Sequence, residues 1–137
     1  MEWQNDDPAG ILRSAHTVAV VGLSHDPSRP SYSVARYLQE QGYRIIPVNP
    51  QEREVLDEPA YPDLTRVPLA IDVVDVFRRA EFVPDIVDQA IQVGAKAVWL
   101  QLGIEHLQAA QRARQAGLKV VMDRCMAIEL RKLPAKE

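Results

Sequence analysis

The sequence has little cysteine, no excess of positive charge and no long apolar segment. Its 137 residues include one cysteine, so no intrachain disulfide can form, and a lone thiol fits a reducing cytoplasm. No apolar run approaches the roughly 20 residues of a membrane helix. Lys and Arg total 16 against 19 Asp and Glu, which argues against nucleic acid as a partner. The acidic start, MEWQNDDPAG, lacks the regions of a signal peptide, so we expect a cytoplasmic protein that binds neither nucleic acid nor a membrane.

Recognisable catalytic and metal-binding patterns are also missing. The sequence contains no G-x-x-x-x-G-K-[ST] phosphate loop and no Ser-His-Asp or Cys-His arrangement. Its histidines and its cysteine are scattered, so we expect no metal site. Asp72 and Asp75 share one predicted strand, where alternation puts them on opposite faces and argues against a catalytic carboxylate pair. We therefore expect no catalytic residues, and a binding protein is a better interpretation than an enzyme.

What the sequence does contain is a repeated pattern of helix, glycine and strand. In QEQGYRIIPV, AIQVGAKAVWL and ARQAGLKVVMD, a helical segment ends at Gly42, Gly94 or Gly117 just before an apolar run. Short glycine-capped links of this kind are typical of parallel α/β proteins. We predict a three-layer, doubly wound, Rossmann-like α/β fold with a five-stranded parallel sheet in the order 3-2-1-4-5. The expected strands are 17–22, 44–48, 70–76, 96–101 and 118–122, and the expected helices are about 31–41, 84–93, 104–116 and 126–132.

The whole chain, 1–137, is expected to form one domain, because its length is close to the commonest domain size. We expect residues 1–11 to be a loosely ordered N-terminal segment. Between Gln51 and Pro68 the chain is polar and rich in proline, which predicts a loop with at most one short turn of helix.

The stretch from Thr17 to Pro50 is the most informative part of the chain. It has the strand–loop–helix–strand order of a nucleotide-binding unit. Its loop keeps only Gly22 of the G-x-G-x-x-G pattern, and its second strand ends on Asn49, where a classical NAD site has Asp or Glu for the ribose hydroxyls. The unit therefore favours a nucleotide other than NAD, and a small NAD(P)-dependent oxidoreductase is kept as an alternative.

The predicted sheet also indicates where a ligand would bind. Open parallel sheets bind ligands beyond the carboxyl ends of their strands, where the strand order reverses. With the order 3-2-1-4-5, this crevice lies between the first and fourth strands. Three arginines, Arg29, Arg78 and Arg79, fall at this edge. A guanidinium suits phosphate because its planar fork donates two hydrogen bonds, although solvated loop charges are the alternative interpretation.

Four segments in sequence order resemble a known family: VGLSHDPSRPSYSVARYLQEQGYRIIPVNP, IDVVDVFRR, VWLQLGI and VVMDRCMAIE. From about Leu12 to Leu133, the chain is similar to stand-alone CoA-binding domain proteins and to the CoA-binding N-terminal domain of the succinyl-CoA synthetase alpha subunit. The resemblance implies that CoA lies across the carboxyl edge of the sheet. It places Gly22, Ser24, Ser28, Arg29 and Pro30 around the phosphates, Val48, Asn49 and Pro50 beside the nucleotide, Phe77 and Arg78 along the next wall, and Gln101 and Gly103 beside the diphosphate or pantetheine.

The function that this resemblance implies is binding of coenzyme A or an acyl-CoA, as a carrier, sensor or subunit without catalytic machinery of its own. A regulatory interaction domain with no small ligand is an alternative. Cys125, which follows the last strand, is interpreted as a buried packing residue; the competing hypothesis is a reactive thiol that forms a mixed disulfide with CoA or serves an acyltransferase. A homodimer is a further open alternative, since an exposed edge strand favours pairing between chains.

Overall fold

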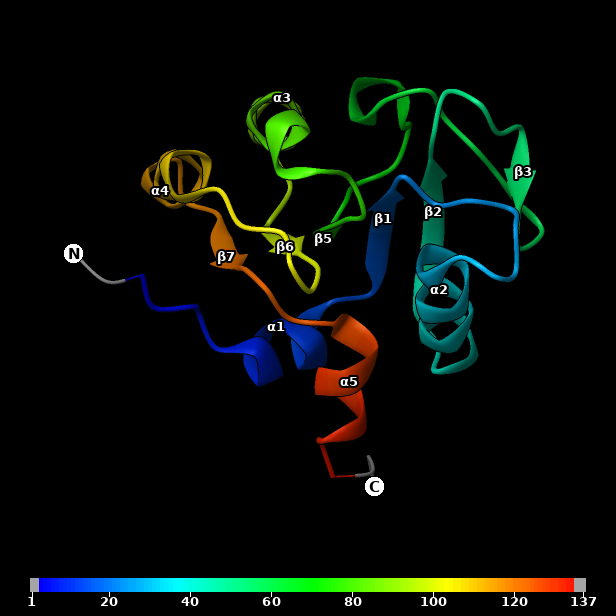
Figure 1. Ribbon diagram of the computed structural model, residues 1–137, viewed down its shortest axis with the longest axis horizontal. Coiled ribbons are helices and arrows are strands. Elements are labelled where there is room, and N and C mark those ends of the chain that lie inside the picture. Colours follow the sequence, from blue (N-terminus) through cyan, green and yellow to red (C-terminus); the bar gives the residue numbers. More distant parts are fainter. Residues whose placement is uncertain (1–2, 135–137) are drawn as a thin grey trace.

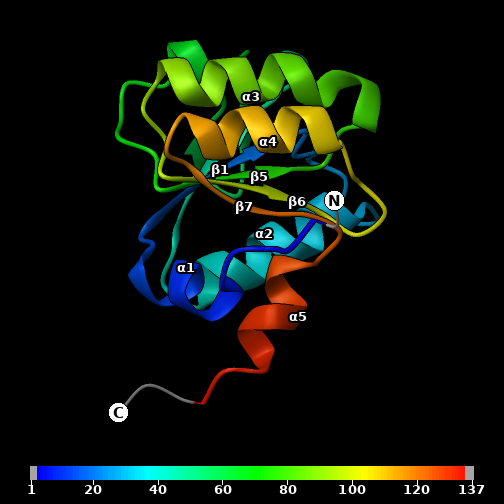
Figure 2. The same ribbon diagram turned by 90° about the vertical axis from the view of Figure 1, so that its left-hand side faces the viewer.

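The protein is a three-layer α/β structure in which helices cover both faces of a parallel sheet. The computed structural model describes residues 3–134. Helices α3 and α4 lie on one face, and α1, α2 and α5 lie on the other (Figures 1 and 2). The sheet strands are β1 (Thr17–Val21), β2 (Arg44–Val48), β5 (Val73–Val76), β6 (Ala97–Leu100) and β7 (Lys119–Val121). The helices are α1 (Pro8–Ser14), α2 (Pro30–Glu40), α3 (Val83–Gln92), α4 (Leu107–Gln115) and α5 (Met126–Arg131).

The predicted Rossmann-like fold with five parallel strands is confirmed, but the predicted strand order is wrong. The order is β2-β1-β5-β6-β7, which is 2-1-3-4-5 when the five strands are counted along the chain, and not 3-2-1-4-5. The third strand therefore pairs with the first, with Val18 opposite Val73 and Val21 opposite Val76. The strand order reverses between β1 and β5, so the carboxyl-edge crevice opens there and not between the first and fourth strands.

The reason for the different order lies at β2, which is an edge strand. Pro47 stands inside β2 and has no N–H to donate to a further strand. On that side the chain instead folds back: the Tyr61 N–H donates to the Pro47 carbonyl at 3.0 Å, and the Asn49 N–H donates to the Tyr61 carbonyl at 2.8 Å. The returning segment contains a small hairpin, β3 (Glu54–Val55) and β4 (Glu58–Pro59), followed by the 3₁₀ turn η1 (Leu64–Arg66). This segment fills the place that a third strand would occupy.

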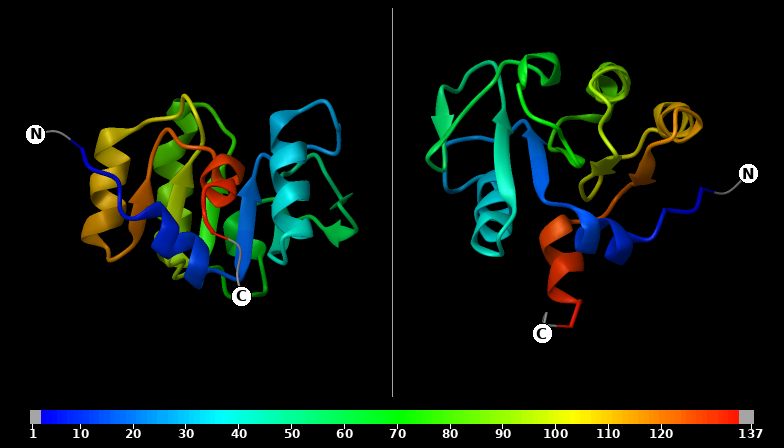
Figure 3. Two further views of the ribbon diagram at one scale, coloured as in Figure 1. Left: turned by 90° about the horizontal axis from the view of Figure 1, so that it is seen from below. Right: turned by 180° about the vertical axis from the view of Figure 1, so that it is seen from behind.

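The amino-terminal segment lies along β7, the edge strand on the side of the sheet opposite β2. The Asp6 N–H donates to the Val120 carbonyl at 3.0 Å, and the Asp6 carboxylate accepts from the Val120 N–H at 2.7 Å. Asn5 similarly accepts from the Met122 N–H at 2.8 Å and donates to its carbonyl at 3.0 Å. The loose order expected for residues 1–11 stays a prediction; residues 5 and 6 are bonded to β7, and residues 1 and 2 lie outside the described part. Figure 3 shows the amino-terminal chain running alongside β7.

The helices and the core follow the sequence pattern closely. Alternate residues of β1 enter the two faces: Val18 and Val20 pack beneath α1, α2 and α5, while Ala19 and Val21 pack beneath α3 and α4. Burial on both faces explains why this strand reads as a continuous apolar run. The three helix-ending glycines all adopt positive φ, as predicted. Within residues 3–134 no helix is long and apolar enough to cross a membrane.

Candidate functional site

A cavity of about 690 Å³ opens at the carboxyl edge of the sheet, at the point where the strand order reverses. Its walls are the loops after β1, β5 and β6, the start of α2 and the residue before α5. The lining residues are Gly22, Ser24, Arg29, Pro30, Ser31, Val34, Phe77, Arg78, Arg79, Ala80, Gln101, Leu102, Gly103, Ile104 and Cys125. The location agrees with the general rule for ligand sites in open parallel sheets.

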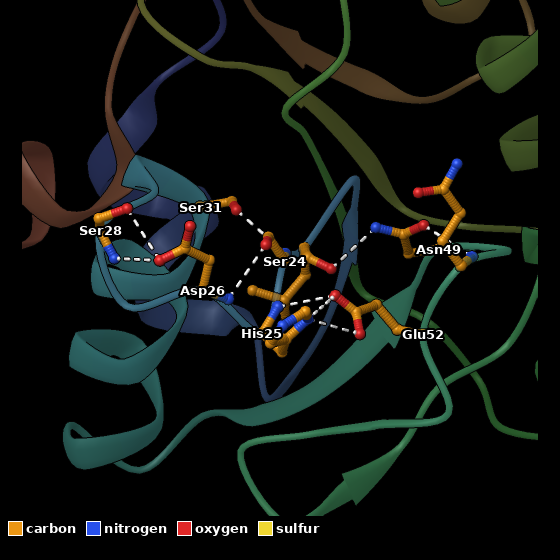
Figure 4. A network of polar contacts seen from close by, with 9 residues as sticks. Ser24, His25, Asp26, Ser28, Ser31, Asn49 and Glu52 are labelled. Carbon is orange, nitrogen blue, oxygen red and sulfur yellow. Dashed lines mark hydrogen bonds and ion pairs between the residues drawn. The ribbon is translucent and has the colours of Figure 1, made fainter.

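The loop after β1 is held in place by its own serine side chains. The Ser31 hydroxyl, in the first turn of α2, accepts from the Ser24 N–H at 3.2 Å, and the Ser24 hydroxyl accepts from the Asp26 N–H at 3.0 Å (Figure 4). Asp26 in turn accepts from both the N–H and the hydroxyl of Ser28, at 2.9 and 2.8 Å. These hydrogen bonds from Ser28 hold the pKa of Asp26 below its ordinary value. The loop is thus held by its own hydrogen bonds, which reduces the entropy that binding would cost.

The segment after β2 ties the same loop from the other side. The Asn49 side-chain amide donates to the Leu23 carbonyl at 3.1 Å, and Glu52 accepts from the His25 N–H at 2.8 Å (Figure 4). The Glu52 carboxylate also contacts His25 Nδ1 at 2.7 Å. Loss of solvent would raise the pKa of Glu52, but the hydrogen bonds from His25 outweigh that effect and lower it. Asn49 therefore fixes the loop backbone, and its predicted place beside a nucleotide stays a prediction.

Two of the three arginines at the cavity, Arg29 and Arg78, form no ion pair within residues 3–134 and can bind an anion. The Arg78 guanidinium lies 4.2 Å from the centre of the Phe82 ring, in the 3₁₀ turn η2 (Ala80–Phe82) that follows β5. This stacking positions the group without neutralising its charge. Arg79 instead contacts Glu81 at 3.3 Å. Arg29 makes no ion pair within residues 3–134 and precedes α2, whose positive dipole end also lies at the cavity.

A buried carboxyl group lies beneath the cavity. Asp75 of β5 is 0% exposed, and its Oδ1 accepts from the Gln101 side-chain amide at 2.6 Å. Burial raises the pKa of Asp75 to about 7, against the opposing effect of that hydrogen bond. The hydrogen-bond partner of Asp75 is thus a side chain from the neighbouring strand end.

Eight of the twelve residues predicted for the site line this cavity: Gly22, Ser24, Arg29, Pro30, Phe77, Arg78, Gln101 and Gly103. The other four do not. Ser28 is exposed and bonds Asp26, Val48 is buried within β2, Asn49 bonds Leu23, and Pro50 occupies the turn after β2. Whether any of the twelve contacts a ligand stays a prediction.

The cavity also has a side that the sequence interpretation missed. Val34 of α2 lines it, and so do Leu102 and Ile104, on either side of Gly103; Leu102 is 58% exposed. The spacing of Ser31 and Val34, three residues apart on one face of α2, is the signal that could have found the helix wall. These residues give the cavity apolar surface in addition to its arginines.

Cys125 lies in the cavity wall, directly before α5, and is buried, with 9% of its surface exposed. It belongs to the core cluster beneath α2 and α5, as the packing interpretation requires. No group of three metal-ligating side chains occurs in the described part of the chain.

A second cavity of about 470 Å³ lies near the amino ends of the strands, between α1, α2 and α5. Arg131 stacks there over Tyr37 at 4.3 Å. The amino ends of parallel strands are not where such folds bind ligands, so the carboxyl-edge cavity is the candidate site.

The fold and this site define a small Rossmann-like α/β protein with an arginine-rimmed cavity where its strand order reverses. The model of the CoA binding domain family matches residues 16–131, and the chain belongs to that family. It is 38% identical over 118 residues to the uncharacterized protein YneT of Bacillus subtilis (strain 168), covering 86% of this chain and 87% of that protein.

Two further relatives place the fold in context. A hypothetical protein from Pyrococcus horikoshii OT3 has a solved structure that matches with a TM-score of 0.90 and 37% identity, over 97% of this chain and 98% of that one. The subunit alpha of acetate–CoA ligase [ADP-forming] II from Pyrococcus furiosus is 27% identical over 122 residues, covering 81% of this chain. The match covers only 27% of that subunit. The ligase activity is therefore a property of the larger relative.

Proposed function

We propose that the protein binds coenzyme A or an acyl-CoA in the carboxyl-edge cavity and acts as a carrier, sensor or subunit without catalytic machinery of its own. The observation that carries this proposal is the coincidence, in a member of the CoA binding domain family, of the 690 Å³ cavity with the free guanidinium groups of Arg29 and Arg78.

The chemistry of the cavity suits the two parts of CoA. The nucleotide part carries a diphosphate and a 3′-phosphate, and Arg29 and Arg78 offer planar donor forks at the rim. The pantetheine arm is neutral and has methyl and methylene groups between its amides, and Val34, Leu102 and Ile104 supply apolar surface for these groups. Both parts of CoA are thus matched by residues that line the cavity.

The alternative of a small NAD(P)-dependent oxidoreductase fits this site less well. A ribose-reading carboxylate is expected at the end of β2, and Asn49 stands there with its amide donated to Leu23. We extend the proposal to a cytoplasmic location, which suits a chain with one buried cysteine.

The test is thermal unfolding and calorimetric titration with CoA, acetyl-CoA, dephospho-CoA, NAD and ATP. At 100 times its dissociation constant, CoA should stabilise the protein by about 2.7 kcal/mol, and NAD should not. Arg78→Ala should weaken CoA binding by about tenfold or more, because a charge-assisted hydrogen bond is lost. Arg44→Ala is the matched control, since it removes the same charge at the opposite edge of the sheet.

A CoA affinity that Arg78→Ala and Arg44→Ala reduce equally would place the ligand elsewhere. No response to any of the five compounds would contradict the proposal and favour the regulatory interaction domain.

A further inference from the structure

Asp75 occupies an unusual position for a carboxyl group. It sits in β5, between Val20 of β1 and Trp99 of β6, and all three residues are 0% exposed. A carboxyl group in such surroundings is costly unless it is paired, and nearly every buried polar group in a folded protein has its partners.

The hydrogen bonding of the Asp75 carboxyl group is incomplete. Gln101 donates one hydrogen bond to Oδ1, while Oδ2 has no partner within residues 3–134. The buried cluster on this face holds, as other titratable side chains, the Cys125 thiol, and the partly buried phenols of Tyr32, Tyr37 and Tyr43 pack against it. Within residues 3–134 the side chain of Asp75 forms its hydrogen bond with Gln101, and burial and that bond are the causes that act on its pKa. The Gln101 amide is therefore the group through which Asp75 acts on the cavity.

Gln101 connects this buried carboxyl to the cavity. It is only 5% exposed, yet it lines the cavity. A glutamine amide has a donor end and an acceptor end, and a carboxylate binds the donor end. Because Nε2 donates to Asp75, Oε1 is the end of the amide left for a ligand.

We infer that Asp75 is a positioning residue that fixes the Gln101 amide with its carbonyl oxygen toward the cavity, where it accepts a hydrogen bond from an amide N–H of the ligand. This inference rests on the proposed function and deepens it. The pantetheine arm of CoA carries amide N–H groups, whereas phosphates at neutral pH mainly accept hydrogen bonds. Gln101 therefore binds the pantetheine arm, and Arg29 and Arg78 bind the phosphates.

A pH dependence follows from this arrangement. When Asp75 is ionised, it holds the donor end of Gln101 and leaves the acceptor end to the ligand. A protonated Asp75 can itself donate to Oε1 once the amide has turned, so the cavity then presents a donor. The affinity for an amide-bearing arm should fall as Asp75 takes up its proton.

The first experiment needs no ligand. The side-chain NH₂ signals of Gln101, followed by nitrogen-15 NMR in the full chain, should titrate with a midpoint near pH 7. In Asp75→Asn, a neutral variant of the same shape, they should stay constant. Signals that do not titrate in the wild-type protein would overturn the inference, and this readout remains even if the variant fails to fold.

The second experiment separates the two ends of the ligand. Affinities for pantetheine, which lacks phosphate, and for 3′,5′-ADP, which lacks the arm, are measured from pH 5.5 to pH 8.5. At each pH the wild-type affinity is divided by the Asp75→Asn affinity, because protonation of the ligand affects both proteins equally and drops out of this ratio. For pantetheine this ratio should fall by about tenfold toward low pH, as one hydrogen bond is lost, and for 3′,5′-ADP it should stay constant.

Gln101→Leu should weaken pantetheine binding by a similar factor at pH 8 and leave no pH step. A step that appears with 3′,5′-ADP and not with pantetheine would overturn the assigned orientation. If the wild-type protein binds neither CoA nor its parts, the proposed function fails and the orientation assigned to the arm fails with it. The Gln101 NMR titration then reports separately whether Asp75 positions the amide.

Discussion

Gly22 and Phe77 are in backbone contact, because a Cβ built on Gly22 would stand 2.7 Å from the Phe77 carbonyl oxygen. Gly22 also has φ of +90°, where side chains are strained. The two residues directly follow the neighbouring strands β1 and β5, so their close approach limits the width of the crevice between the two loops.

Gly22→Ala should therefore lower the free energy of unfolding by several kcal/mol, since strain at positive φ alone costs about 1–3 kcal/mol and a backbone clash adds to it. Urea denaturation measures the change. Gly103→Ala is the matched control: its φ is +80°, but no atom lies within 4 Å of the added Cβ. Equal losses in the two variants would show that the close approach to Phe77 contributes nothing.

Asn49→Asp tests the link between the segment after β2 and the first loop. The substitution removes the donor to the Leu23 carbonyl and brings two oxygens together, so stability should fall by about 1–2 kcal/mol. Amide hydrogen exchange in residues 23–31 should become faster. Gln51→Glu, in the adjacent exposed turn, adds the same charge and should change neither quantity. A variant that gains NADH binding without losing stability would contradict this role for Asn49.

Asp75 should make the protein more stable at acid pH than at neutral pH. Its folded-state pKa of about 7 lies above its ordinary value, so the native state binds the proton more tightly than the unfolded chain. This contribution to stability is complete below about pH 4 and is lost as the pH rises to about 7.

The difference between the unfolding free energies of Asp75→Asn and the wild-type protein, measured by denaturation at pH 4–8, should therefore increase across this window. Subtracting the two curves removes the contribution of Asp72, whose lowered pKa acts in the opposite direction and at lower pH. A difference that does not vary with pH would contradict the raised pKa.

Asp6→Ala tests how the amino-terminal segment is held. Its carboxylate accepts from the Val120 N–H and from Arg114 at 3.0 Å, so the variant leaves a backbone donor of β7 without its partner. Stability should fall by about 1–2 kcal/mol in thermal or urea unfolding. Glu105→Ala removes an exposed carboxylate that makes no hydrogen bond in the described residues and should have little effect. Equal effects would indicate that only net charge matters.

The elements of the fold could be predicted because each has a local signal. The apolar run of β1 and the glycines after α2, α3 and α4 located most strands and helices to within a few residues. Two local signals were overlooked. Pro47 favours β2 as an edge strand and so argues against the order 3-2-1-4-5. Asp7-Pro8 is a helix start, and Asp7 indeed caps α1 by accepting from the Ala9 N–H at 3.1 Å.

Other parts of the site depend on contacts that no local pattern encodes. Asp75 and Gln101 are neighbours only because β5 pairs with β6 in a register that places Asp75 opposite Trp99. Asn49 and Ser28 are close in the sequence to residues that line the cavity. Their side chains instead donate hydrogen bonds to the Leu23 carbonyl and to the Asp26 carboxylate. Side-chain direction at strand ends is decided by such partners, so it could not be predicted from residue type.

The covered edges of the sheet have a consequence for how this protein can be joined to others. Tyr61 occupies the outer side of β2, and Asn5 and Asp6 occupy the outer side of β7. These contacts leave less of the two edge strands open to pairing with a strand from another polypeptide. Partly covered edges suit a unit that stands beside other domains, and a chain similar to it forms part of a larger ligase subunit. Modularity is in this sense built into the two margins of the sheet.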